Sequence, residues 1–176
     1  MIDQPIAVRS GEELPVEALS AYLRREIPGF TRITQVAQFP GGFSNLTYLL
    51  QTNLGEWVLR RPPRGANIKS AHDMGREYRV LERLQGIYGR IPQTVHLCAD
   101  SSIIGSSFYL MERVQGLILR NRIPSGFSAT PEQMRLLSQA AIDNLAFLHQ
   151  IDIQATGLIE LGKPTGYVDR QVKGWT

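Results

Sequence analysis

The stretch Phe39–Pro63, "FPGGFSNLTYLLQTNLGEWVLRRPP", places a glycine pair and small polar residues between apolar runs, and it ends in two arginines and two prolines. The runs "NLTYLLQT" and "EWVLR" are typical of strands, and "NLG" between them is typical of a hairpin turn. The alternating run "TRITQVAQF" precedes them. We therefore predict three antiparallel strands. A Walker-type phosphate loop runs into a helix, whereas this glycine pair runs into a strand, which indicates a hairpin tip.

The rest of the chain predicts a mixed order of helices and strands. A helical stripe of Leu19, Leu23 and Ile27 precedes the three strands, and a second helix is expected over residues 69–86, with Ser70 as N-cap and Gly86 as terminator. Two further strands follow, over 94–100 and 107–114. The order is helix, three strands, helix, two strands, which is an α+β pattern.

A second unit is expected after a linker. Residues 116–128 contain two glycines and a proline, so we place a lobe boundary near residues 114–116. The helix that follows, over 130–152, begins with a capping box formed by Thr130 and Gln133. Its apolar stripe comprises Met134, Leu137, Ala141, Leu145 and Leu148. The last segment, "GYVDRQVKGWT", reads as the start of another helix without a terminator, and we expect the chain to be cut from something longer.

Composition excludes several classes. The chain has 176 residues, 43% hydrophobic and 20% charged, as is usual for globular proteins. No apolar run approaches the roughly 20 residues that cross a bilayer, and the N-terminus lacks a secretory pattern, so we expect a cytoplasmic protein without a membrane partner. Cys98 is the only cysteine and is expected in the core. The stretch "RRPPRG" allows weak nucleic-acid binding, but a net charge of +3 without interleaved aromatic residues argues against it.

Two charged residues point to chemistry. Strand alternation allows only one arginine of "WVLRRPP" to share a face with Val58, and that residue is Arg60. Glu77 lies on the apolar stripe of the second helix, where a carboxylate needs a partner. We predict an ion pair between Arg60 and Glu77 that directs the cation toward phosphates. The alternatives are a solvated strand end for Arg60 and a helix-surface acid for Glu77.

Two backbone segments complete the candidate site. The glycines before Ser44 and Asn45 allow backbone amides to approach a ligand closely, and these two side chains add hydrogen bonds. In "FYLMERVQG" a strand breaks into the linker and offers backbone groups suited to a planar heterocycle. An ordinary glycine turn and an interlobe strand are the alternative interpretations.

The ordered segments "GGFSNLTYLL", "WVLRRPP", "REYRVLERL", "FYLMERVQG", "LAFLHQID" and "YVDRQVKGW" resemble the aminoglycoside phosphotransferase family, in the branch related to domains fused to acyl-CoA dehydrogenases. The resemblance implies a protein-kinase-like small lobe, which is a five-stranded antiparallel sheet with a helix between strands 3 and 4. The first helices of a truncated α-helical large lobe follow. It divides the chain into a nucleotide-binding lobe, 1–115, and a hinge with the start of the second lobe, 116–176.

The resemblance also implies site residues. Arg60 takes the place of the lysine that touches the ATP phosphates, and Glu77 is its helix partner. His149 and Asp152 resemble a structural helix end and not the catalytic His-x-Asp. The remaining binding residues are the loop over the phosphates and the hinge beside adenine: Gly41, Gly42, Phe43, Ser44, Asn45, Met111, Glu112 and Val114.

The implied activity is transfer of a phosphoryl group from ATP to a hydroxyl group of a small molecule. No catalytic or metal-binding residue is expected within this chain, because the catalytic aspartate and the Mg²⁺ ligands of the family lie beyond Thr176. The chain alone is therefore expected to be inactive. The alternative is a non-catalytic, kinase-like regulatory or interaction module, which the replacement of lysine by Arg60 favours.

Overall fold

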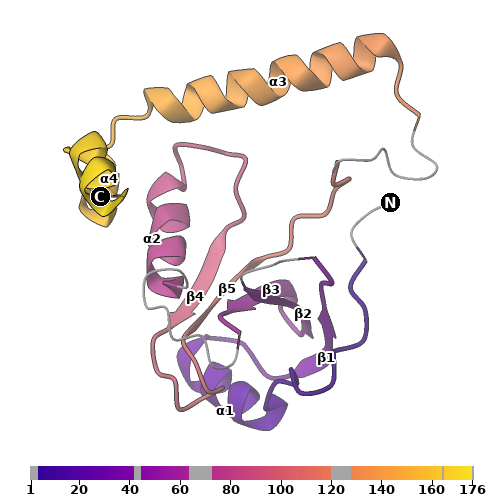
Figure 1. Cartoon of the computed structure of the whole chain (residues 1–176). Coiled ribbons are helices and arrows are strands. Elements are labelled where there is room, and N and C mark those ends of the chain that lie inside the picture. The colour runs from indigo at the N-terminus through magenta and orange to yellow at the C-terminus, as the bar shows by residue number, and fades with distance from the viewer. Residues whose placement is uncertain (1–3, 42–44, 64–72, 120–127, 164, 176) are drawn as a thin grey trace.

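The computed structural model describes residues 4–41, 45–63, 73–119, 128–163 and 165–175. These residues form a five-stranded sheet in the order β1-β2-β3-β5-β4, and every neighbouring pair is antiparallel. Helix α1 precedes the sheet, and α2 lies between β3 and β4 (Figure 1). The α+β class and the predicted element order are therefore confirmed. The bounds are α1 Val16–Glu26, β1 Ile33–Gln38, β2 Leu46–Thr52, β3 Gly55–Arg61, α2 Met74–Leu84, β4 Thr94–Cys98 and β5 Phe108–Glu112.

The main core lies between α1 and one face of the sheet. Side chains alternate between faces along a strand, so residues opposite each other on β2, β3 and β5 point the same way. Tyr48, Leu59 and Leu110 are such a row, and all three are fully buried with Leu19 and Leu23 of α1. The predicted stripe of α1 is thus confirmed. Ile27 packs at its edge, and Cys98 is a buried, free thiol of the same cluster.

The opposite face of the sheet carries the candidate site. In the register, Val58 of β3 lies opposite Leu49 and Met111, and Arg60 lies opposite Tyr109. Helix α2 contacts β4 and β5 on this side. Core packing on one face therefore determines which residues of β3 and β5 meet α2 on the other.

Helix α2 begins later than its sequence suggests. Ser70, the predicted N-cap, lies outside the described residues, and the described helix begins at Met74 with Asp73 as its cap. The Asp73 carboxylate accepts a hydrogen bond of 2.8 Å from the backbone N–H of Arg76. Met74, the first residue of the helix, is 1% exposed and is therefore buried directly beside this cap. Gly86 follows the C-cap with a φ of +78°, which confirms it as the terminator.

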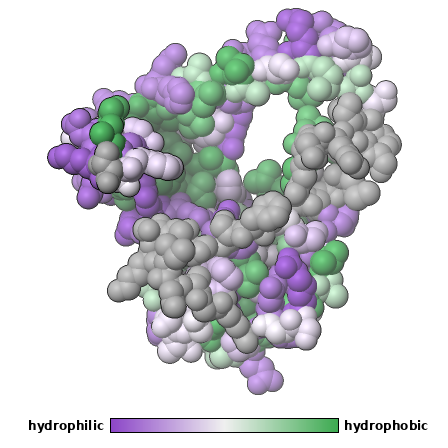
Figure 2. Space-filling model, viewed as in Figure 1, coloured by the Kyte–Doolittle hydropathy of each residue, from purple (hydrophilic) through white to green (hydrophobic). Residues whose placement is uncertain are grey.

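The second unit comprises α3 (Pro131–Gln150), the short 3₁₀ helix η1 (Leu158–Leu161) and α4 (Tyr167–Trp175). The predicted capping box is present, because Thr130 and Gln133 exchange hydrogen bonds of 2.8 and 3.2 Å. Helix α3 extends alongside the sheet domain, and the space-filling view shows an opening beneath it (Figure 2). No residue of α3 is buried, and the predicted apolar stripe is largely exposed. The division into lobes at 115/116 stays a prediction.

Side-chain contacts at two places join this second unit to the sheet domain. The ring of Phe147 on α3 stacks on Tyr88 at 5.7 Å. At this first place Asn144 of α3 also accepts hydrogen bonds from Tyr88 and Arg90. At the C-terminal end of α2, Arg83 pairs with Glu160 of η1 at 2.7 Å and donates to the carbonyl of Gly157. Among the described residues, no helix is both long enough and apolar enough to cross a membrane.

Candidate functional site

Strand β3 separates its two terminal arginines. Leu59 and Arg61 point toward the α1 side, where Arg61 is 2% exposed and donates to the carbonyl of Ile104. Arg60 points to the other side with Val58, as the alternation predicted. There its Nη2 lies 3.3 Å from Oε2 of Glu77. The predicted ion pair is present, and both side chains are about one-third exposed, at 32% and 34%.

The Glu77 carboxylate has two further donors. Asn45 donates from Nδ2 to Oε1 at 2.9 Å, and the Tyr109 hydroxyl donates to Oε2 at 3.1 Å. Three side chains from different parts of the sheet thus converge on one acid of α2. Asn45 is the only buried member of the predicted phosphate loop among its described residues, Gly41 and Asn45. Gly42, Phe43 and Ser44 lie outside the described residues.

Tyr109 is the residue that the sequence interpretation missed. It is 1% exposed, and its ring contacts Tyr78 edge-on at 6.2 Å. Burial raises the pKa of the Tyr109 hydroxyl, with Glu77 adding to the rise and Arg60 opposing it. The hydroxyl therefore keeps its proton and remains a donor. Tyr109 lies two residues before Met111 in the strand, so the two side chains share one face of the sheet. That placement could have indicated a site residue, since a buried tyrosine hydroxyl normally has a hydrogen-bond partner.

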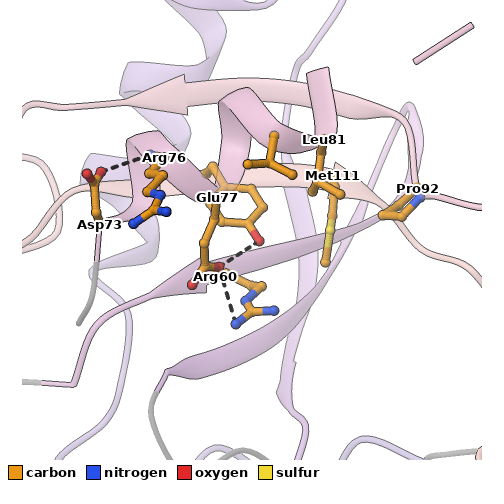
Figure 3. A pocket seen from close by; sticks show the side chains of 9 residues that line it. Arg60, Asp73, Arg76, Glu77, Leu81, Pro92 and Met111 are labelled. Atoms are coloured by element: carbon orange, nitrogen blue, oxygen red, sulfur yellow. Dashed lines mark hydrogen bonds and ion pairs between the residues drawn. The ribbon is translucent and has the colours of Figure 1, made fainter. Parts of the chain in front are cut away.

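A cavity of about 690 Å³ opens beside this cluster (Figure 3). Charged groups at one end and apolar side chains at the other suit a ligand with an anionic part and a flat or apolar part. Nε of Arg60 is buried and has no hydrogen-bond partner among the described residues, so the guanidinium has donor capacity that Glu77 does not use. The cavity is lined by Arg60, Asp73, Arg76, Glu77, Val80, Leu81, Pro92, Tyr109 and Met111.

The predicted hinge is divided between two places. Met111, at the start of the predicted hinge, lines the large cavity, whereas Val114 is 71% exposed and lines a second cavity of about 300 Å³ together with Val58. The backbone N–H of Glu112 donates to the carbonyl of Gln93 at 2.8 Å. Of these residues Met111 lines the same cavity as Arg60, and contact between the hinge and adenine stays a prediction.

An ion pair fixes the start of this hinge. The backbone N–H of Arg113 donates to the Glu56 carbonyl, and its Nη1 lies 2.9 Å from the Glu56 carboxylate. The guanidinium also lies over the ring of Phe39, 5.8 Å from its centroid. Phe39 and Arg113 both line the second cavity. The entry to the glycine segment and the end of β5 are thus held together.

The "HQID" segment has a structural role. His149 lies in the last turn of α3, and the Asp152 carboxylate accepts hydrogen bonds from the backbone N–H groups of Gln154 and Ala155. Asp152 therefore shapes the turn after the helix, as predicted. Within the described ranges, no three His, Cys, Asp or Glu side chains lie close enough to hold a metal ion.

The sheet with its inserted helix, and the strand–helix ion pair beside a cavity, define a kinase-like fold. One solved structure shares it: a Ralstonia eutropha JMP134 protein assigned as an aminoglycoside phosphotransferase matches with a TM-score of 0.74 and 36% identity, over 93% of this chain and 46% of that one. The model of the phosphotransferase enzyme family matches residues 35–176. The chain belongs to this family.

The curated relatives are longer proteins. Acyl-CoA dehydrogenase family member 11 of Rattus norvegicus is 35% identical over 175 residues, which are 97% of this chain and 22% of that protein. The Homo sapiens protein of the same name is 37% identical over 164 residues, 91% of this chain and 21% of that protein. Acyl-CoA dehydrogenase family member 10 of Mus musculus is 36% identical over 170 residues, 96% and 16% respectively. The chain spans about a fifth of the length of these relatives.

Proposed function

We propose that this chain is the nucleotide-binding lobe and hinge of an ATP-dependent phosphotransferase that acts on a hydroxyl group of a small molecule. One observation supports this most directly: the Arg60–Glu77 ion pair lies beside a cavity on the face of the sheet that α1 leaves uncovered. A partly buried ion pair contributes little to stability after desolvation, so its presence is better explained by ligand binding.

The residues of the site fit a phosphate ligand. Arg60 retains an unpartnered Nε among the described residues, and a guanidinium presents several N–H donors in one plane, as phosphate oxygens require. Glu77 orients that guanidinium. Bound ATP would supply the transferable γ-phosphoryl group, and Mg²⁺ would offset its charge.

The acids of the cavity are not free to bind Mg²⁺. Asp73 caps α2, and Glu77 accepts from Asn45 and Tyr109 while it faces Arg60. We therefore assign the metal ligands and the catalytic base to other parts of a longer protein, of the kind that the relatives exemplify. The acceptor is a small molecule with a hydroxyl group.

A non-catalytic module is the second candidate, because an arginine stands at the position of the family's lysine. Isothermal titration of the complete gene product with ATP and Mg²⁺, followed by transfer of labelled γ-phosphate across a panel of hydroxyl compounds, separates the candidates. Turnover eliminates the module. Nucleotide binding without turnover on any acceptor favours it. Absence of nucleotide binding refutes both the enzyme proposal and the nucleotide-binding form of the module.

A further inference from the structure

The Glu77 carboxylate is held from three directions. Asn45 immediately precedes β2, Arg60 lies near the end of β3, and Tyr109 lies in β5, so three positions across the sheet meet one residue of α2. Oε1 accepts from the Asn45 amide, while Oε2 accepts from the Tyr109 hydroxyl and faces Arg60. Carboxylate oxygens offer enough lone pairs for all three contacts at once.

The two neutral donors are better fixed than the cation. Asn45 is 7% exposed and Tyr109 is 1% exposed, whereas the side chains of Arg60 and Glu77 are each about one-third exposed. The Arg60–Glu77 separation of 3.3 Å is also the longest of the three contacts. An ion pair with this much solvent exposure does not by itself fix the position of the Glu77 carboxylate, so the two buried donors are the groups that can fix it.

We infer that Asn45 and Tyr109 are positioning residues, which fix the Glu77 carboxylate and through it the direction in which Arg60 presents its guanidinium to an anionic ligand. The inference rests on the proposed function for its ligand, the phosphates of a nucleotide. Its geometric part concerns the side chains alone. Removal of one donor leaves Glu77 held by the other alone, and removal of both leaves it free to turn toward water, so that Arg60 follows it or loses its partner.

A direct contact between Asn45 and phosphate is the competing explanation for any loss of affinity. A double-mutant cycle distinguishes the two, because residues that act through a shared partner give non-additive effects. If Asn45 acts through Glu77, then Asn45→Ala has little further effect once Glu77→Gln is present. If Asn45 binds phosphate itself, the two losses multiply.

The binding experiment uses the complete gene product and compares ATP–Mg²⁺ with adenosine by isothermal titration. We expect Tyr109→Phe and Asn45→Ala each to weaken ATP binding about 10- to 150-fold, the scale of one hydrogen bond to a charged group, while adenosine affinity stays unchanged. Tyr78→Phe is the matched control, because it makes the same chemical change, loss of a tyrosine hydroxyl, in the neighbouring ring that contacts Tyr109 edge-on. Equal losses for ATP and adenosine, or losses that multiply both when Asn45→Ala and when Tyr109→Phe is combined with Glu77→Gln, overturn the inference.

A second measurement does not depend on nucleotide. Crystal structures of the Tyr78→Phe variant and of the Asn45→Ala/Tyr109→Phe double variant give the Arg60 Nη2–Glu77 Oε2 distance directly. We expect the pair to persist in the control and to separate beyond 4 Å in the double variant. If it separates while the unaltered protein binds no ATP, the positioning role stands and the proposed function fails. If both donors are removed and the pair is unchanged, the positioning role is wrong whatever the affinities are.

Discussion

Replacing Arg60 with methionine should damage nucleotide binding far more than folding. The Arg60–Glu77 pair spans 3.3 Å, and the two side chains are 32% and 34% exposed. Solvent screens a pair of this kind, so it contributes about 0–1 kcal/mol to the free energy of unfolding. Arg60→Met leaves Glu77 with its hydrogen bonds from Asn45 and Tyr109, and the methionine keeps much of the apolar length of arginine. We therefore expect a loss of at most about 1 kcal/mol of stability.

The loss of affinity is expected to be larger. A hydrogen bond between charged partners contributes about 1.5–3 kcal/mol, which corresponds to a roughly 10- to 150-fold change in the dissociation constant. Arg60 has the donors to make at least one such bond, since a guanidinium carries five N–H groups, Glu77 faces its Nη2, and the residue lines the cavity. Isothermal titration with ATP–Mg²⁺ measures this change, and urea denaturation of the same sample measures stability.

The matched control is Arg25→Met. Arg25 lies on α1, on the far side of the sheet, and forms an exposed ion pair with Glu26 at 2.9 Å. It should lose as little stability as Arg60→Met and keep its affinity for ATP. Our reasoning is refuted if Arg60→Met binds ATP as tightly as the Arg25 control, or if it loses several kcal/mol of stability.

Three further predictions concern the scaffold. Burial lowers the pKa of His96 from its ordinary value of 6.5, so the unfolded chain binds more protons below that pH, and the free energy of unfolding should fall as pH drops through about 6.5. His96→Phe should abolish this slope in urea titrations, and a slope unchanged by the substitution would contradict it. Glu160→Ala should reduce the free energy of unfolding, measured in urea, by about 0.5 kcal/mol or less, because Glu160 is 68% exposed. Arg83→Ala should reduce it by about 1 kcal/mol more, since it also removes the donor to the Gly157 carbonyl. Equal losses in the two variants would contradict this expectation. Cys98→Ala should reduce stability by about 1 kcal/mol without altering phosphoryl transfer by the complete protein, and rapid reaction of the native thiol with a disulfide reagent would be inconsistent with its 2% exposure.

The fold could be predicted because its signals are local and periodic. The helical stripe of Leu19 and Leu23 and the capping box of Thr130 and Gln133 follow from spacing alone, and both are present. The order of hydrophobic runs then predicts one sheet with a helix inserted after β3. Strand alternation also separated Arg60 from Arg61, so the strand-to-helix pairing with Glu77 was accessible from sequence.

What failed depends on packing that spacing does not encode. Ser70 and Asp73 are both good N-cap residues, and the segment between them contains no periodic apolar pattern. The described cap is Asp73, next to the buried Met74. The choice of cap therefore goes with the burial of Met74, which residue spacing does not reveal. For Tyr109 the strand pattern shows which face the ring occupies but not where its hydroxyl ends. That contact depends on the packing of α2 against β5, which brings Glu77 to the Tyr109 hydroxyl.

The same packing bears on how an arginine can serve where the family carries a lysine. A lysine ammonium is a single compact charge, so a carboxylate partner and a phosphate compete for one group. A guanidinium carries five N–H donors on three nitrogens, and here Nη2 faces Glu77 while Nε has no partner among the described residues. Glu77 in turn accepts from Asn45 and Tyr109, so it does not depend on Arg60 for all its hydrogen bonds. An acid with two neutral donors needs only part of the guanidinium, and the remaining N–H groups can face the cavity. The arginine is therefore compatible with phosphate binding because its partner is already well supplied.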